Sequence, residues 1–180
     1  MHFAPTALKD ATLIELDKHE DARGYFARTF CEEEFRAAGL PARFAQANSA
    51  GTRQAGTVRG LHYQVPPHAE AKLIRCTQGA IYDVIIDLRP DSPTRGRWEG
   101  FKLDAKSGRM LLVPEGFAHG YQALTGDTEV FYLVSHPYVA GAEAGVRFND
   151  PVFAIAWPLA VTVVSEKDLN WPDYRWPSGV

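Results

Sequence analysis

The sequence predicts an all-β fold, either a β-sandwich or a double-sheet barrel, with short helices only at its periphery. From residue 44 to about residue 158, apolar residues follow the two-residue period of strands, and Gly or Pro repeatedly breaks the pattern. Helical periodicity is confined to one short stretch, and no repeat or linker divides the 180 residues. We therefore expect one domain over residues 1–180, in which N-terminal strands and a C-terminal tail pack on a core of about 44–158.

Two weak strand patterns precede this core, at residues 12–16 and 25–30. Thr29 and Glu32 then have the spacing of a capping box, in which each side chain bonds to the backbone amide of the other residue. This spacing predicts a short helix over residues 33–38.

Eight further strands are expected within the core. Their ranges are 44–49, 57–64, 72–77, 80–88, 98–104, 109–113, 118–124 and 129–135. In the 80–88 strand one face is apolar, whereas the other alternates isoleucine with Asp83 and Asp87, as in a sheet that lines a partly polar space. The tail after residue 165 carries Trp171 and Trp176, so we expect it to pack on the body or on a partner chain.

Composition and charge exclude several classes of function. A net charge of −3 provides no basic field for nucleic acid or for an anionic membrane, so an anionic ligand needs a local cluster of arginine or lysine. Cys31 and Cys76 are too few for a disulfide scaffold and are expected to be buried thiols in a reducing compartment and not a bridge. The chain starts without a signal-peptide pattern and lacks a membrane-length apolar run, so we expect a cytoplasmic location.

A metal site is suggested by one motif and opposed by another. Pro114–His119 resembles the second motif of the cupins, small jelly-roll barrels in which this histidine ligates a metal. The first cupin motif needs two histidines one residue apart, and the position two residues after His62 holds another residue type. His68 and Glu70 lie beyond the Pro66-Pro67 pair, off the strand, so we expect neither to contribute to the site. The sequence therefore favours a cupin-like double-sheet jelly roll without a bound metal.

Five polar residues can instead provide metal-free proton chemistry at a barrel mouth. A histidine such as His62 or His119 can remove a carbon-bound proton if a carboxylate such as Asp168 fixes its tautomer. Lys72 can stabilise the resulting enolate, and Tyr132 can return a proton to the opposite face. This set describes an epimerase acting next to a ketone, with no cofactor. Each residue also has an ordinary structural role open to it, and strand periodicity does not choose between them.

The order of motifs along the chain resembles the dTDP-4-dehydrorhamnose 3,5-epimerase family over nearly its whole length. The matching motifs are Asp21-x-Arg23-Gly24-x-Phe26, Gln46-x-Asn48, Arg59-Gly60-Leu61-His62-x-Gln64, Lys72-Leu73, Gly79-x-x-x-Asp83, Asp87-Leu88-Arg89, Ser92-Pro93-Thr94, Pro114-x-Gly116-Phe117-Ala118-His119-Gly120, Tyr132, Asn149-Asp150-Pro151, Trp157-Pro158 and Ser165-x-Lys167-Asp168. The resemblance implies a homodimeric, metal-free, cupin-type jelly roll that acts on a nucleotide-diphospho-4-keto-6-deoxyhexose in rhamnose-like deoxysugar biosynthesis.

By this resemblance, His62 is the catalytic base, oriented by Asp168, and Tyr132 is the acid on the opposite face of the sugar. Lys72 stabilises the enolate. Other positions match groups that bind the substrate, with Arg59 on the diphosphate, joined by Arg23 from the partner subunit. The remaining expected substrate-binding residues are Phe26, Arg28, Gln46, Asn48, His119, Tyr138, Glu143 and Lys167.

One position departs from the family pattern. The family places a glutamate near the thymine ring, and this chain has Arg28 there. Thymine N3 carries a hydrogen and suits a carboxylate, whereas cytosine N3 is an acceptor and suits a donor. Arg28 therefore suggests a CDP-linked sugar, unless its side chain turns to phosphate or solvent and the base is recognised elsewhere.

Several related functions remain open at this point. The first is an epimerase inverting C5, or C3 and C5, of a dTDP- or CDP-linked 4-keto sugar. A 3,4-ketoisomerase on the same fold and a CDP-linked 5-epimerase are alternatives, as is a catalytically silent sugar-nucleotide-binding protein. A silent protein need not keep His62, Lys72, Tyr132 and Asp168 together, so their joint presence favours an enzyme.

Overall fold

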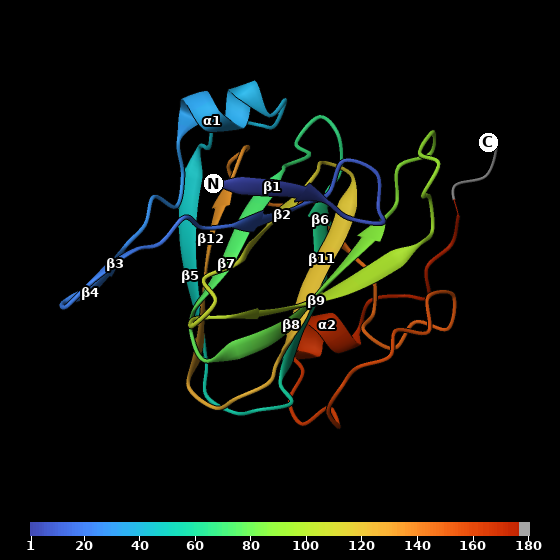
Figure 1. Ribbon diagram of the computed structural model, residues 1–180. Coiled ribbons are helices and arrows are strands. Elements are labelled where there is room, and N and C mark those ends of the chain that lie inside the picture. Colours follow the sequence, from blue (N-terminus) through green and yellow to red (C-terminus); the bar gives the residue numbers. More distant parts are fainter. Residues whose placement is uncertain (177–180) are drawn as a thin grey trace.

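A computed structural model of the protein describes residues 1–176, and residues 177–180 of the expected tail lie outside the described residues. Two antiparallel sheets are stacked face to face (Figure 1). The six-stranded sheet has the order β1 (His2–Pro5), β2 (Thr12–Glu15), β10 (Met110–Val113), β7 (Lys72–Gln78), β12 (Thr128–Val134) and β5 (Gln46–Thr52). The five-stranded sheet has the order β13 (Glu143–Gly145), β6 (Val58–Gln64), β11 (Phe117–Ala123), β8 (Ala80–Asp87) and β9 (Trp98–Asp104). This arrangement confirms the expected double-sheet jelly roll.

The main core lies between the two sheets and is built from alternate residues of each strand. Ile74 and Val130 enter it from the six-stranded sheet, and Ile81 and Ile85 enter it from the five-stranded sheet, all fully buried. Each such side chain contributes about 1.5–3 kcal/mol to the free energy of unfolding. Because alternate residues share a face, strands that hold this core also direct other side chains into the space between the sheets.

Most expected strands are present within a few residues of their predicted bounds, and the deviations lie near the ends of the chain. The predicted strand at 25–30 continues only to Phe26, and β1 and β13 were not expected. The capping-box prediction was wrong, because helix α1 (Glu32–Ala37) has Cys31 at its N-cap with no side-chain hydrogen bond. The helix is held instead by Phe35, which is fully buried in a cluster of four phenylalanine rings.

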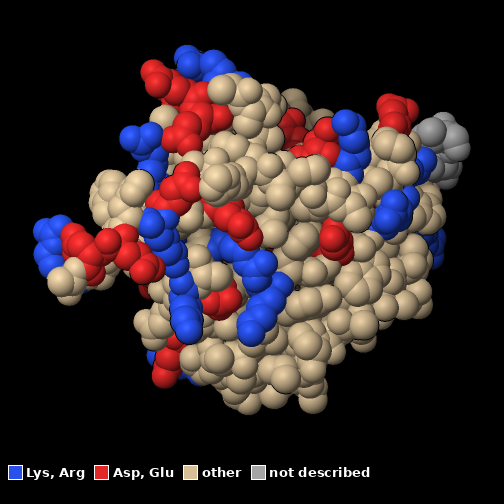
Figure 2. All heavy atoms as spheres, in the orientation of Figure 1, with Lys and Arg blue, Asp and Glu red and all other residues tan. Residues whose placement is uncertain are grey.

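A hairpin projects from the body of the molecule. Strands β3 (His19–Asp21) and β4 (Gly24–Phe26) pair only with each other among the described strands, and the hairpin extends well away from both sheets (Figure 1). Its surface carries charges of both signs (Figure 2, left). We call residues 19–26 the arm.

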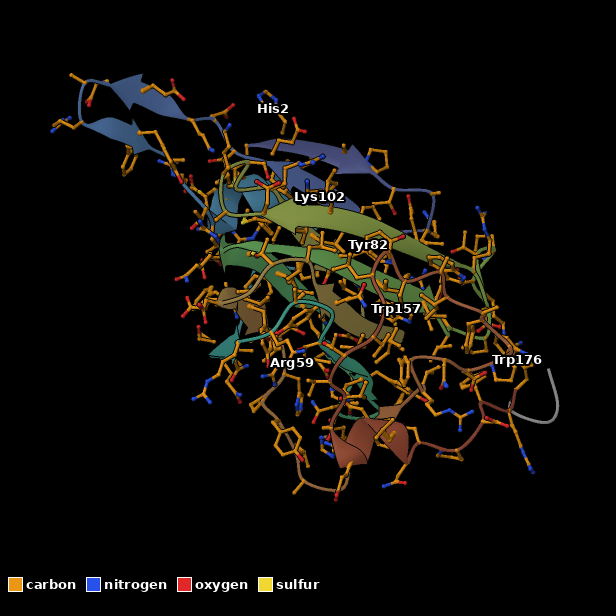
Figure 3. All side chains as sticks on the ribbon, turned by 90° about the horizontal axis from the view of Figure 1, so that it is seen from below. His2, Arg59, Tyr82, Lys102, Trp157 and Trp176 are labelled. Carbon is orange, nitrogen blue, oxygen red and sulfur yellow. The ribbon has the colours of Figure 1, made fainter. Side chains whose placement is uncertain are left out.

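The C-terminal segment, in its described part, packs on the five-stranded sheet. The indole of Trp171 lies against Gly145, where an added Cβ would stand 2.2 Å from a ring atom. Trp157 packs edge-on against Tyr82 of β8 (Figure 3). This segment also contains helix α2 (Glu166–Leu169), which contacts β6.

The described residues bear on disulfide bonding and on membrane-spanning helices. Both cysteines are free; Cys76 is buried, as expected, whereas Cys31 is partly exposed. Within residues 1–176, no helix combines the length and the apolar character that crossing a membrane would require.

Candidate active site

Strand β6 contains an extra residue relative to its partner β11. His62 pairs with His119 and Arg59 pairs with Tyr121, so Gly60 and Leu61 of β6 lie opposite the single residue Gly120 of β11. Such a β-bulge changes which residues of a strand share a face. Residues three apart normally point to opposite faces, but here His62 and Arg59 both line the space between the sheets.

Gly60 makes the bulge possible. Its φ of +110° is a conformation that residues with a Cβ rarely adopt. A Cβ at this position would also stand 2.6 Å from the Cα of Gly120 on the neighbouring strand. The backbone amide of Gly60 therefore leaves the sheet ladder and donates a hydrogen bond to Asp168 Oδ2 at 3.1 Å.

Asp168 connects this bulge to the imidazole of His62. Its Oδ1 lies 2.5 Å from His62 Nε2, and it is buried at the C-terminal helix α2, where its amide donates to Ser165 Oγ. Burial would raise the pKa of Asp168, but the hydrogen bonds from the His62 ring and the Gly60 amide hold it below its usual value. A charged carboxylate accepts only, so His62 donates from Nε2 and carries its lone pair on Nδ1.

Two adjoining cavities between the sheets share three of the expected catalytic residues, His62, Lys72 and Tyr132. The first has a volume of about 220 Å³ and is also lined by Gln46, Asn48, Gln64, Glu70, Val134, His136, Tyr138 and Glu143. The second has a volume of about 200 Å³ and is also lined by Ala50, Arg59, His119, Gly120, Tyr121 and Val130. His62 comes from one sheet, whereas Lys72 and Tyr132 come from the other.

Lys72 is fixed inside the cavity by two contacts. Its Nζ donates to the backbone oxygen of His62 at 3.1 Å and lies 3.2 Å from Glu70 Oε1. An ammonium group has three N–H bonds, so one remains for a ligand.

Tyr132 stands on β12, across the cavity from His62 in the opposite sheet. Burial raises the pKa of its phenol, Arg59 lowers it, and the Glu70 and Glu143 carboxylates raise it further. The phenol therefore keeps its proton throughout the neutral range and can act as an acid.

Two cations lie at or beside the cavities. Arg59 lines the second cavity and donates from Nε to Thr52 Oγ1 at 3.0 Å and from Nη2 to the Gly51 backbone oxygen at 2.7 Å, which fixes its guanidinium (labelled in Figure 3). Lys167 donates to Glu143 Oε2, and this carboxylate raises the pKa of the lysine. These cations are the local cluster that an anionic ligand requires in a chain of negative net charge.

Other expected substrate-binding residues form one polar wall of the first cavity. Gln46 Nε2 donates to Asn48 Oδ1 at 2.8 Å, and Gln46 Oε1 accepts from the Tyr138 amide at 3.2 Å. The Tyr138 phenol lies 3.5 Å from Glu143 Oε2. These contacts link β5, the loop after β12 and β13 around the cavity mouth.

Two acidic residues belong to the site although sequence reasoning assigned them no role. Asp83 Oδ1 lies 2.7 Å from His119 Nε2, so His119 has a carboxylate partner of its own. Glu70, which we expected to be irrelevant, is buried and lines the first cavity beside Lys72. For Asp83, the sequence signal was its alternation with isoleucines on β8. The role of Glu70 was not recognised because the 66–67 proline pair suggested that the chain leaves the barrel before it.

Arg23 and Phe26 of the arm, and Arg28 just beyond it, are placed differently from the rest of the predicted site. The Arg23 side chain pairs with Asp21, Phe26 is 73% exposed, and Arg28 donates to Glu34 Oε1 on α1 at 2.8 Å. None of these three residues lines either cavity of its own chain.

Comparisons with known proteins agree with this geometry. A family described as dTDP-4-dehydrorhamnose 3,5-epimerase matches residues 5–175. A protein of that name from Sinorhizobium fredii is 43% identical over 173 residues, which cover 96% of this chain and 89% of the relative. One from Methanothermobacter thermautotrophicus is 40% identical over 176 residues, with 96% and 94% covered.

Solved structures are similar over the same extent. The crystal structure of a dTDP-4-dehydrorhamnose 3,5-epimerase from Bacillus anthracis, with TDP and PPi bound, has a TM-score of 0.92 and 43% identity, covering 95% of this chain and 98% of that chain. A Legionella pneumophila epimerase in complex with dTDP-4-keto-L-rhamnose has a TM-score of 0.87 and 33% identity, covering 93% and 89%.

Proposed function

The chain belongs to the dTDP-4-dehydrorhamnose 3,5-epimerase family, and on that premise we propose that its cavity binds a dTDP-linked 4-keto-6-deoxyhexose and inverts C5, or C3 and C5. The observation that carries the proposal is one cavity with a carboxylate-bound histidine on one wall and a protonated tyrosine on the other. Inversion needs a base and an acid on opposite faces of the same carbon, and this arrangement supplies both.

In the proposed reaction His62 Nδ1 removes the proton next to the C4 ketone. Nε2 is occupied by Asp168, which leaves Nδ1 as the basic atom of the ring. Asp168 also stabilises the imidazolium that forms, because its charge lies within hydrogen-bond distance of the ring.

The electron pair left on carbon moves to the C4 oxygen and forms an enolate, which the Lys72 ammonium stabilises. Its two contacts to the protein fix the ammonium before substrate binds, so little reorganisation is needed when the negative charge develops. Tyr132 then donates its proton to the opposite face of the carbon, and the ketone is restored.

The diphosphate is assigned to Arg59 together with Arg23 of the partner subunit in a homodimer. Support comes from the arm, which extends away from both sheets (Figure 1) and whose Arg23 and Phe26 line neither cavity of their own chain. We further propose that residues 1–180 act as one catalytic domain, with His119 near the sugar and Gln46, Asn48, Tyr138, Glu143 and Lys167 around the nucleotide or sugar.

A dTDP-linked substrate is favoured over a CDP-linked one. Relatives named for dTDP-sugars extend over nearly the whole chain, and the Arg28 guanidinium is already paired with Glu34. Parallel calorimetric titrations with dTDP and CDP test this choice. Clearly tighter binding of CDP would contradict it and would reinstate a pairing of Arg28 with cytosine.

The reaction is tested by incubating the protein with dTDP-4-keto-6-deoxyglucose in heavy water and locating the label by NMR. We expect deuterium at C5, or at C3 and C5, with the C4 ketone retained. A ketone moved to C3 would identify a 3,4-ketoisomerase, and nucleotide binding without any label would identify a silent binding protein.

A further inference from the structure

Glu70 differs from the other carboxylates of the site in how much of its hydrogen-bonding capacity is used. Asp168 accepts from a histidine ring and a backbone amide, and Glu143 contacts a lysine and a tyrosine. Glu70 pairs with Lys72 through Oε1 alone. Its Oε2 is buried and has no hydrogen-bond partner within residues 1–176.

Glu70 belongs to the wall of the first cavity and not to the apolar core. The Glu70 side chain is only 6% exposed, and a buried acceptor left without a donor is destabilising. Among the described residues that line the first cavity, Glu70 is the one with such an atom. A carboxylate has about four lone-pair sites, so Glu70 can accept from a donor at the cavity wall while Oε1 stays paired with Lys72.

The charge of Glu70 limits what that donor can be. A carboxylate repels the diphosphate and the enolate oxygen, both of which are negative, and it attracts a neutral hydroxyl. Lys72 lies next to Glu70 and presents its remaining N–H as the group for the developing charge. Within the proposed substrate, the hydroxyls of the hexose are the donors that remain.

We propose that Glu70 binds the hexose of the substrate by accepting a hydrogen bond from one of its ring hydroxyls, and that it thereby selects sugars that carry this hydroxyl. The inference rests on the proposed function, because that function supplies the hexose. A site built around a hydroxyl discriminates strongly against analogues that lack it, since the buried partner is then left unpaired.

The test compares binding of dTDP with binding of dTDP-glucose, which carries hexose hydroxyls but has no C4 ketone to react. In calorimetric titrations, Glu70→Ala should weaken the binding of dTDP-glucose by roughly 10- to 100-fold, which is the range for loss of a hydrogen bond to a charged group. Binding of dTDP alone should be unchanged. Glu115→Ala, which removes an exposed glutamate in the turn before β11, is the matched control and should change neither.

Analogues of dTDP-glucose lacking the 2- or the 3-hydroxyl complete a double-mutant cycle. The analogue without the contacted hydroxyl should bind the wild type weakly, and Glu70→Ala should weaken it no further. The inference is overturned if Glu70→Ala leaves dTDP-glucose binding intact and lowers only the rate of deuterium exchange, because Glu70 would then act through Lys72 alone. Equal weakening of dTDP and dTDP-glucose also overturns it. A wild-type protein that binds neither ligand would instead refute the proposed function.

Discussion

Two histidine–aspartate pairs face the cavities from neighbouring strands, and they differ in how the carboxylate is held. His62 and His119 are cross-strand partners, and each presents Nε2 to an aspartate, at 2.5 Å and 2.7 Å respectively. Asp168 uses both oxygens, because the Gly60 amide donates to the second one. In the other pair, Asp83 Oδ2 is buried and lacks a partner within the described residues.

This difference supports the proposal that the His62 pair abstracts the proton. His62 is 31% exposed and lines both cavities, whereas His119 is 11% exposed and lines one. A doubly bonded carboxylate fixes the imidazole in one orientation, so its free nitrogen is aimed at one place. The His119 pair is less constrained and is suited to contacting the substrate.

The comparison is tested most severely by His62→Ala. We expect deuterium incorporation to fall by about 10⁴-fold, the upper end for loss of a general base, while dTDP binding is largely retained. Quantitative NMR in heavy water measures the first and calorimetry the second. If exchange survives in this variant, His62 is not the base.

Asp168→Asn should give the next largest effect. The amide keeps the shape of the carboxylate but cannot stabilise an imidazolium, so we expect exchange to fall by roughly 10²-fold. Asp173→Asn is a matched control, because Asp173 lies on the same C-terminal segment and pairs with Arg147 at the surface. An unchanged exchange rate in Asp168→Asn would remove the distinction between the two pairs.

Asp83→Asn should have a smaller effect of another kind. If His119 contacts the sugar and does not move the proton, the variant should raise KM by about 10-fold, equivalent to ~1.4 kcal/mol of binding, and change kcat little. Steady-state kinetics with varied sugar nucleotide measures both constants. A loss in kcat comparable to that of Asp168→Asn would mean that both pairs transfer protons.

The smallest expected effect is on stability in acid. The pKa of Asp168 lies below its usual 3.8 in the folded protein, so the unfolded chain takes up the proton first as the pH falls. Its contribution to the free energy of unfolding is therefore present above pH 3.8 and is lost as the pH falls through the folded pKa. Urea unfolding should show that the difference in free energy of unfolding between wild type and Asp168→Asn becomes smaller from pH 5 downward. A difference that stays constant with pH would contradict this linkage.

Sequence patterns predicted the sheets well and the site unevenly. Strand alternation and turn residues located most of the core strands, because burial between two sheets imposes a two-residue period. Asp168 was a candidate from the sequence, but its pairing with His62 came only from family resemblance, because it reaches His62 by docking of α2, 106 residues downstream. The role of Asp83 was missed because a carboxylate aimed between two sheets looks, in sequence, like any polar residue on a strand. Glu70 was missed because it lies in the loop between β6 and β7.

Strand alternation does not predict that Arg59 and His62 share one face of β6. Counting by twos places them on opposite faces of β6, and only the extra residue at Gly60 brings them together. The glycine itself is visible in the sequence, but its closeness to Gly120 is a property of two strands in register.

The bulge in β6 has a consequence for how this enzyme tolerates changes in length. Deleting one residue between Arg59 and His62 would leave every catalytic side chain in the sequence and would restore an uninterrupted ladder with β11. The same deletion would turn the guanidinium and the imidazole to opposite sides of the sheet and withdraw the amide that holds Asp168. We therefore expect loss of a single codon between Arg59 and His62 to reduce activity as much as loss of His62.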